Sequence, residues 1–142
     1  MANARDFRTG RHVVHQLQAH LVFVPKYRRG VITKRVFETL RSAWEQVCTD
    51  FESELRESGW ESDHVHLLVS YPPKVALSRL VNSLKGVSAR KLRAENLPEV
   101  RAKLWGEHFW SPSYCALSSG GAPLDTIKRY IQKQRGGASF PP

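Results

Sequence analysis

Apolar residues recur along this chain with two different spacings. Short runs rich in valine and leucine, bounded by proline, glycine or serine, are typical of β-strands, whereas apolar residues three and four positions apart predict amphipathic helices. The strands expected on this basis cover residues 17–24, 53–62, 63–70 and 114–118, the second of them bulged near Gly59, and the helices cover 33–50, 75–94, 98–105 and 123–135.

The order of these elements predicts the fold. Apart from the short helical turn at 98–105, it runs strand, helix, strand, strand, helix, strand, with one more helix at the end. This is the ferredoxin-like, or split βαβ, plan of an α+β domain, with an antiparallel sheet and helices on one face. We divide the chain into a basic, largely unstructured arm at 1–15, one domain at 16–137 and a tail at 138–142.

The stretch Asp63-His64-Val65-His66-Leu67-Leu68-Val69-Ser70 holds the first candidate for chemistry. Because strand side chains alternate between the two faces of a sheet, His64 and His66 project together, and an apolar row faces the other way. Two imidazoles in a fixed orientation are a good start on a divalent-metal site, although imidazole suits several ions. The alternative is that they are two partly exposed polar positions on a half-buried strand.

Composition narrows the functional classes. With 142 residues the chain is too short for a barrel of eight β/α units, which disfavours a barrel hydrolase carrying the histidine pair. Lys and Arg number 22 against 13 Asp and Glu. The resulting net charge of +9 and pI near 10.0 point to a polyanionic partner, most simply nucleic acid.

Cysteine usage and hydropathy bear on the compartment. The two cysteines lie far apart and outside any metal-binding pattern, so a disulfide framework is not supported and a reducing cytoplasm is expected. Residues 1–10 lack an apolar signal segment, and no stretch approaches about 18 apolar residues. We therefore expect a cytoplasmic protein without a membrane span.

Basic residues gather on two of the expected elements. The turn after the first strand combines cations with an aromatic ring, which suits phosphate contact and base stacking, although a solvated loop is the alternative; its residues are Lys26, Tyr27, Arg28 and Arg29. The outer surface of helix 75–94 favours a phosphate-binding face, and its cations are Arg79, Lys85, Arg90, Lys91 and Arg93.

The last helix carries a second chemical group. Tyr130 and Gln134 are four residues apart and share a helical face. Lys128 and Lys133, with two arginines, surround the tyrosine with positive charge and are further candidates for DNA contact. A phenol has a pKa of about 10, and cations or a metal nearby would favour the phenolate needed for attack. The alternative is an ordinary amphipathic helix with a half-buried tyrosine.

Four motifs occur together in one order. They are His20-Leu-Val-Phe-Val-Pro-Lys-Tyr-Arg-Arg29, the histidine stretch at 63–69, Leu104-Trp105-Gly106 followed by Trp110-Ser-Pro-Ser-Tyr114, and Ile127-Lys-Arg-Tyr130-Ile-Gln-Lys-Gln134. In this order the chain resembles the single-tyrosine HUH transposases, the TnpA-type enzymes of the small peel-and-paste bacterial insertion sequences. The Met-Pro that often precedes the histidine pair in this family is replaced here by Trp60-Glu61-Ser62.

The resemblance implies a transposase that cleaves and rejoins single-stranded DNA at insertion-sequence ends, within a bacterial nucleoid, through a 5′-phosphotyrosine intermediate. Tyr130 would be the nucleophile, and His64, His66 and Gln134 would bind Mg²⁺ or Mn²⁺. The DNA partner would carry end hairpins. Family members are ferredoxin-like homodimers that exchange the tyrosine helix between subunits, and Gly120-Gly121 matches the flexible joint before that helix.

Two other functions remain open at this point. An HUH nickase of the replication or conjugation type is one, although such enzymes commonly use a third histidine and often a second tyrosine near the first. A non-catalytic domain of ferredoxin-like fold that binds single-stranded nucleic acid is the other. A degenerate relative of that kind would be expected to lose His64, His66 or Tyr130, and all three are present.

Overall fold

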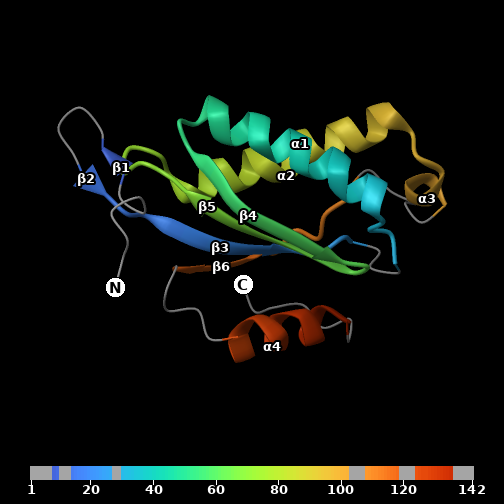
Figure 1. Cartoon of the computed structure of the whole chain (residues 1–142). Coiled ribbons are helices and arrows are strands. Elements are labelled where there is room, and N and C mark those ends of the chain that lie inside the picture. The colour runs from blue at the N-terminus through green and yellow to red at the C-terminus, as the bar shows by residue number, and fades with distance from the viewer. Residues whose placement is uncertain (1–7, 10–13, 27–29, 103–107, 119–123, 136–142) are drawn as a thin grey trace.

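The computed structural model describes residues 8–9, 14–26, 30–102, 108–118 and 124–135, with the backbone alone at 124–127 and 134–135. The elements of this part of the chain are shown in Figure 1. In chain order they are β1 (Arg8–Thr9), β2 (Val14–His15), β3 (Gln18–Phe23), α1 (Lys34–Asp50), β4 (Glu54–Glu61), β5 (His64–Ser70), α2 (Leu77–Glu95), α3 (Pro98–Arg101), β6 (Cys115–Ser118) and α4 (Leu124–Arg135).

Four strands form one antiparallel sheet in the order β4-β5-β3-β6, and β1 pairs with β2 separately. The chain runs from β3 through α1 to the β4–β5 hairpin, and from there through α2 to β6 at the other edge. This is the ferredoxin-like topology. It confirms the α+β fold class and the order of elements expected from the sequence.

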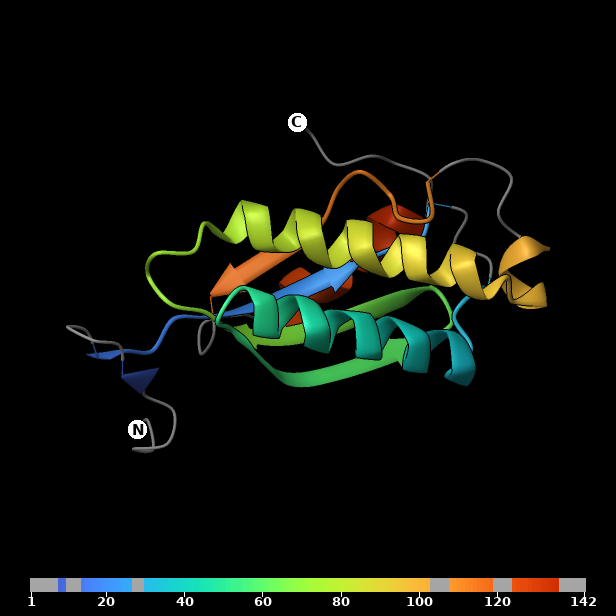
Figure 2. The same cartoon turned by 90° about the horizontal axis from the view of Figure 1, so that it is seen from above.

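The helices cover both faces of this sheet. α1 and α2 lie side by side on one face, while α4 lies on the opposite face (Figures 1 and 2). α1 begins where the sequence predicts, because the Thr33 hydroxyl accepts a hydrogen bond from the Val36 N–H at 3.3 Å. α2 ends at Asn96, whose left-handed backbone (φ 53°) is a conformation that asparagine tolerates.

The main core fills the space between α1, α2 and the sheet. Phe23 of β3 meets Trp110 edge-on with 5.6 Å between ring centroids, and Trp44 of α1 packs against the same ring at 6.4 Å. The Trp110 indole N–H donates to the buried Ser88 hydroxyl of α2 at 3.1 Å. The segment before β6 is therefore anchored in the core at Trp110.

A smaller apolar cluster lies on the other face of the sheet. Val22 and Val24 of the β3 segment pack there against Tyr130 and Ile131 of α4, with Cys115 at its edge. Covering both faces explains why the β3 segment is apolar at every position from Leu21 to Val24, since a strand buried on both sides lacks the usual alternation with polar residues. The cluster places the tyrosine helix on the face that α1 and α2 leave open.

Of the arm expected to be largely unstructured at residues 1–15, the structure describes residues 8–9 and 14–15, which form β1 and β2. β1 and β2 pair as antiparallel strands. The Arg8 guanidinium donates to the backbone oxygen of Ser70 at 3.1 Å and to that of Glu52, and it lies 3.9 Å from the Glu54 carboxylate. These contacts attach the arm beside the start of β4 and the end of β5. They also give the backbone oxygen of Ser70, a fully buried residue, a hydrogen-bond partner.

Other local expectations also need correction. The irregularity in β4 falls between Leu55 and Glu57, not near Gly59. The helical turn expected at 98–105 is α3, Pro98–Arg101.

Both cysteines, Cys48 and Cys115, are free. In the part of the chain that the structure describes, no helix is both long and apolar enough to cross a membrane.

Candidate active site

The two histidines of β5 project from the sheet face that α4 covers. Their ring centroids are 6.5 Å apart, and Val65 and Leu67 between and beside them are buried in the main core on the other face. The alternation expected from the sequence is therefore confirmed. In the register of the sheet, Val22 of β3 stands opposite His66, and directly opposed residues of an antiparallel pair share a face.

His64 is held by its neighbour in the sequence. Its ring is buried, and its Nδ1 lies 2.9 Å from an Asp63 carboxylate oxygen. Because a carboxylate accepts hydrogen bonds, this contact favours the tautomer with the proton on Nδ1, in which Nε2 carries the lone pair. A carboxylate behind one ring nitrogen is the arrangement that orients metal-binding histidines in proteins.

His66 lies against Gly59, its partner on β4. A Cβ built on this glycine would sit 2.3 Å from Nε2 of the imidazole, so no other residue type fits without displacing the ring. Partial burial lowers the pKa of His66, and nearby His64 and His20 lower it further. The neutral ring, which is the form that binds metals, is therefore favoured near pH 7.

Pairing of the strands adds groups that the sequence reasoning did not place here. Glu57 and Glu61 of β4 act on His66 in the opposite direction, since their charges raise its pKa. Both stand on the histidine face, opposite Leu68 and His64. The signal was the two-residue spacing of Glu57, Gly59 and Glu61, which becomes informative only when the register is known. Within the described ranges, no three His, Cys, Asp or Glu side chains gather as a metal site.

Tyr130 lies on the same face and is 3% exposed. It packs on Val22 and Val24, and its hydroxyl is 3.0 Å from the Ser113 hydroxyl. Burial raises the pKa of Tyr130, and Cys115 adds to this, while the bond with Ser113 acts against it. The expectation that cations surround the phenol and favour the phenolate is wrong for this conformation, because the ring points into the apolar cluster.

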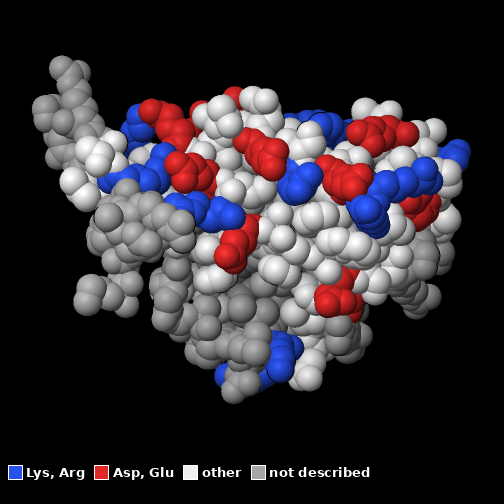
Figure 3. Space-filling view, viewed as in Figure 1, with Lys and Arg blue, Asp and Glu red and all other residues white. Residues whose placement is uncertain are grey.

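Two cations of α4 lie at the surface, unlike the buried phenol. Lys128 and Lys133 are exposed, and Figure 3 shows basic side chains at the α4 side of the molecule, whereas acidic and basic groups mix over α1. Gln134 lies in the last turn of α4, one turn after Tyr130. Its side chain lies outside the described residues, so its role as a ligand stays a prediction.

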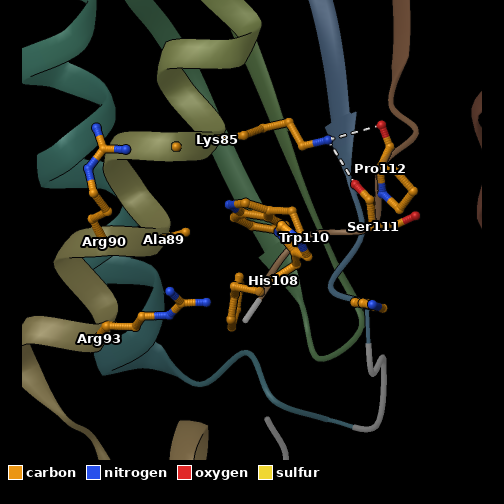
Figure 4. Close-up of a pocket in the computed structure, with 11 residues that line it drawn as sticks. Lys85, Ala89, Arg90, Arg93, His108, Trp110, Ser111 and Pro112 are labelled. Carbon is orange, nitrogen blue, oxygen red and sulfur yellow. Dashed lines mark hydrogen bonds between the residues drawn. The ribbon is translucent and has the colours of Figure 1, made fainter. Parts of the chain in front are cut away.

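The cations expected on one face of α2 lie in three different surroundings. Lys91 turns toward α1 and donates to the Ser42 hydroxyl at 2.9 Å. Arg79 is exposed near the start of the helix. The other three line a basic pocket of about 490 Å³ between α2 and the segment at 108–112 (Figure 4); they are Lys85, Arg90 and Arg93. They are therefore not one continuous face.

Within this basic pocket the cations differ in what they can bind. Arg93 extends toward His108 across the pocket (Figure 4). Lys85 is half-buried, and its ammonium donates to the backbone oxygen of Ser111 at 2.8 Å. Burial lowers the pKa of Lys85. Lys26 also lines the pocket, whereas the other three residues of its turn lie outside the described residues; these are Tyr27, Arg28 and Arg29.

Known proteins resemble this chain over most of its length. The family profile described as "Transposase IS200 like" matches residues 13–134. The ISDra2 transposase TnpA of Deinococcus radiodurans is 35% identical over 129 residues, which cover 91% of each chain. The transposase for insertion sequence element IS200 of Salmonella typhimurium is 28% identical over 129 residues, which cover 91% of this chain and 84% of that protein.

Two solved structures share the fold. A crystal structure named as a transposase from Deinococcus radiodurans R1 superposes with a TM-score of 0.78 at 33% identity, over 89% of this chain and 97% of that one. A REP-associated tyrosine transposase bound to a REP hairpin superposes with a TM-score of 0.54 at 16% identity, over 93% of this chain and 75% of that one. At this low identity, the second likeness concerns the fold alone.

Proposed function

Because the chain belongs to the IS200-like transposase family, we propose that it cleaves and rejoins single-stranded DNA through a covalent 5′-phosphotyrosine bond at Tyr130. The observation that carries this proposal is the packing of Tyr130 on Val22, which stands opposite His66 in the sheet. A nucleophile and a pair of imidazoles thus share one face of one small domain. A domain that only binds nucleic acid would not need a tyrosine hydroxyl beside two imidazoles.

The proposed cleavage of the DNA strand needs no cosubstrate. The Tyr130 oxygen, once its proton has been lost, attacks the scissile phosphorus in line, and the bond from phosphorus to the 3′ oxygen breaks. The leaving 3′ oxygen takes up a proton, which gives a free 3′-hydroxyl. The phosphodiester energy is kept in the link between protein and DNA. A new 3′-hydroxyl can therefore lose its proton and attack this phosphorus, which breaks the bond to the Tyr130 oxygen, returns a proton to the phenol and rejoins the strand without ATP.

His64 and His66 would hold Mg²⁺ or Mn²⁺, with Gln134 as the third protein ligand. The residues present fit such an ion, because Asp63 fixes the tautomer of His64 and the lowered pKa of His66 favours its neutral form. When bound, the ion would polarise the scissile phosphate and stabilise the charge that develops on its oxygens. The contribution of this chain is to hold the imidazole rings of His64 and His66 in position.

The DNA partner would be a single strand that folds into a hairpin at the end of the element. The net charge of +9 and the basic pocket beside α2 support a polyanionic ligand. The structural neighbour bound to a REP hairpin supports the same class of partner through its fold. Arg90 and Arg93 would contact phosphate there, with Lys26 at the rim.

The active form would be a homodimer in which the tyrosine helix is exchanged between subunits. In the single chain, α4 packs on its own sheet through the small cluster around Val22 and Val24. Exchange of an identical element keeps the same contacts, so the partner's helix could occupy this position equally well. The contact between α4 and the sheet is therefore compatible with a helix from the same chain or from the partner.

Adduct formation tests the proposed function. The protein is mixed with single-stranded oligonucleotides from the DNA flanking its gene, with Mg²⁺ or Mn²⁺, and analysed on denaturing gels. We expect a band that migrates as protein plus DNA, that is lost with EDTA and that is absent in Tyr130→Phe. An oligonucleotide that is bound but never linked to the protein would favour the non-catalytic nucleic-acid-binding function instead.

A further inference from the structure

The segment between Trp110 and β6 connects the basic pocket to the tyrosine. Its start is tied to β3 by two backbone bonds, from the Lys26 N–H to the Phe109 oxygen and from the Ser111 N–H to the Val24 oxygen, each 2.8 Å long. The Trp110 indole bonded to Ser88 fixes it to α2 as well. The segment is therefore held on one side by the sheet and on the other by a helix.

Lys85 holds the rest of this segment from the pocket side. Its ammonium donates to the backbone oxygens of three successive residues, Ser111 at 2.8 Å and Pro112 and Ser113 at 3.4 Å each. Figure 4 shows the first two of these bonds. The ammonium also lies 5.6 Å from the centre of the Tyr114 ring. One charged group thus contacts the backbone of the whole segment.

Ser113 turns from this backbone toward the nucleophile. Its hydroxyl is 3.0 Å from the Tyr130 hydroxyl, and the Ser111 hydroxyl lies 3.4 Å behind it. We propose that Ser113 is a positioning residue for the transposition reaction, which holds the Tyr130 phenol while Lys85 holds the backbone that carries Ser113. The inference rests on the proposed role of Tyr130 as nucleophile and extends it to a residue outside the histidine strand.

A positioning role follows from the burial of the phenol and from its bond with Ser113. Tyr130 is almost fully buried among Val22, Val24 and Ile131, so its hydroxyl has little water around it. A hydroxyl aimed at the phenol oxygen then decides which way this oxygen points, and it can donate to the phenolate when the proton leaves. The other titratable groups on this face of the sheet come from all four strands; they are His20 on β3, Glu57 and Glu61 on β4, His64 and His66 on β5, and Cys115 on β6.

The test compares Ser113→Ala with the matched variant Ser113→Thr, which keeps the hydroxyl. We expect Ser113→Ala to form adduct about tenfold more slowly, the factor that one hydrogen bond of ordinary strength corresponds to. Its rate profile should also move to higher pH. Ser113→Thr should stay close to wild type.

A readout that does not depend on activity completes the experiment. In the full chain labelled at the tyrosine ζ-carbons, the Tyr130 signal, assigned with Tyr130→Phe, is titrated with pH. Ser113→Ala should raise the Tyr130 pKa, and Ser113→Thr should restore it. An unchanged titration and an unchanged adduct rate in Ser113→Ala would overturn the positioning role. If the titration moves but the wild type forms no adduct with DNA, the contact is real and the proposed function is what fails.

Discussion

At the scale of single residues, the position of the His66 ring depends on the absence of a side chain at residue 59. Gly59 stands opposite His66, and the imidazole occupies the space where a Cβ would be. The other glycine with close neighbours, Gly86 in α2, differs sharply, because a Cβ there would approach only the Arg90 guanidinium, at 3.4 Å. The two positions therefore form a natural pair for mutation to alanine.

We predict different effects for this pair. Gly59→Ala should change the free energy of unfolding little, because the added methyl group meets only the outer end of the His66 ring, which is exposed and can turn aside. It should also weaken Mn²⁺ binding by about tenfold or more, since His66 is displaced. Gly86→Ala should raise the free energy of unfolding by up to about 1 kcal/mol, as alanine is the better helix former. Urea unfolding and Mn²⁺ titration measure the two quantities.

An unchanged Mn²⁺ affinity in Gly59→Ala would refute the close approach of His66 to Gly59. The comparison also shows what sequence can supply at this scale. Alternation along one strand was enough to place His64 and His66 together, because it is a local property. The contacts of Gly59 and Ser113 depend on which strands pair and in which register, and no short stretch of sequence contains that information.

At the scale of elements, the short helix α3 is joined to the start of α1. Glu99 accepts from the Arg35 guanidinium at 2.6 and 2.7 Å and from the Thr33 hydroxyl, which also caps α1, at 2.9 Å. The hydrogen bond from Arg35 is the main cause that lowers the pKa of Glu99 to about 2, from 4.5. A carboxyl group with a lowered pKa stabilises the fold only while it is ionised.

This contact predicts how the protein responds to acid. The stabilisation from Glu99 is present above pH 4.5 and is lost as the pH falls toward about 2, because the folded state must then take up a proton at the cost of this bond. Glu99→Gln should therefore flatten the fall in the free energy of unfolding over this range. Arg35→Gln should do the same, and the double variant should add little more. Full additivity of the two single effects would contradict the contact.

Elements were predictable to different degrees for a physical reason. The long amphipathic helices and the apolar strands follow local periodicity, so their order and approximate bounds were correct. The pairing of β1 with β2 was not expected, because both strands are short and one of their anchors, Arg8, bonds to groups brought near only by folding. The irregularity of β4 was misplaced because glycine there serves the His66 contact, whereas the shift lies at Leu55.

At the scale of the whole molecule, the two halves of the site belong to separate parts of the chain. The histidines stand on β5 in the central sheet, and Tyr130 stands on α4, which contacts that sheet through a small cluster. The phenol seen here is buried, with a raised pKa, so its proton must be removed before attack. Placement of α4 relative to the histidines is the variable on which activity would depend.

Mixing two inactive variants tests whether that placement is shared between subunits. Tyr130→Phe and His64→Ala should each be inactive alone. If the tyrosine helix is exchanged, half of the dimers formed on co-expression are mixed, and one of the two sites in each is intact, so about a quarter of the wild-type activity should return. Strand cleavage assays measure this. No recovery, with mixed dimers present, would mean that each chain uses its own helix.

The most direct test of the central claim is to find the residue that becomes linked to DNA. The adduct formed with end-hairpin DNA and Mn²⁺ is digested with trypsin and analysed by mass spectrometry. Because cleavage after Arg129 and Lys133 releases residues 130–133, the DNA 5′-phosphate should appear on this short peptide. A link to one of the other three tyrosines, or to no tyrosine at all, would contradict the assignment of Tyr130 as the nucleophile.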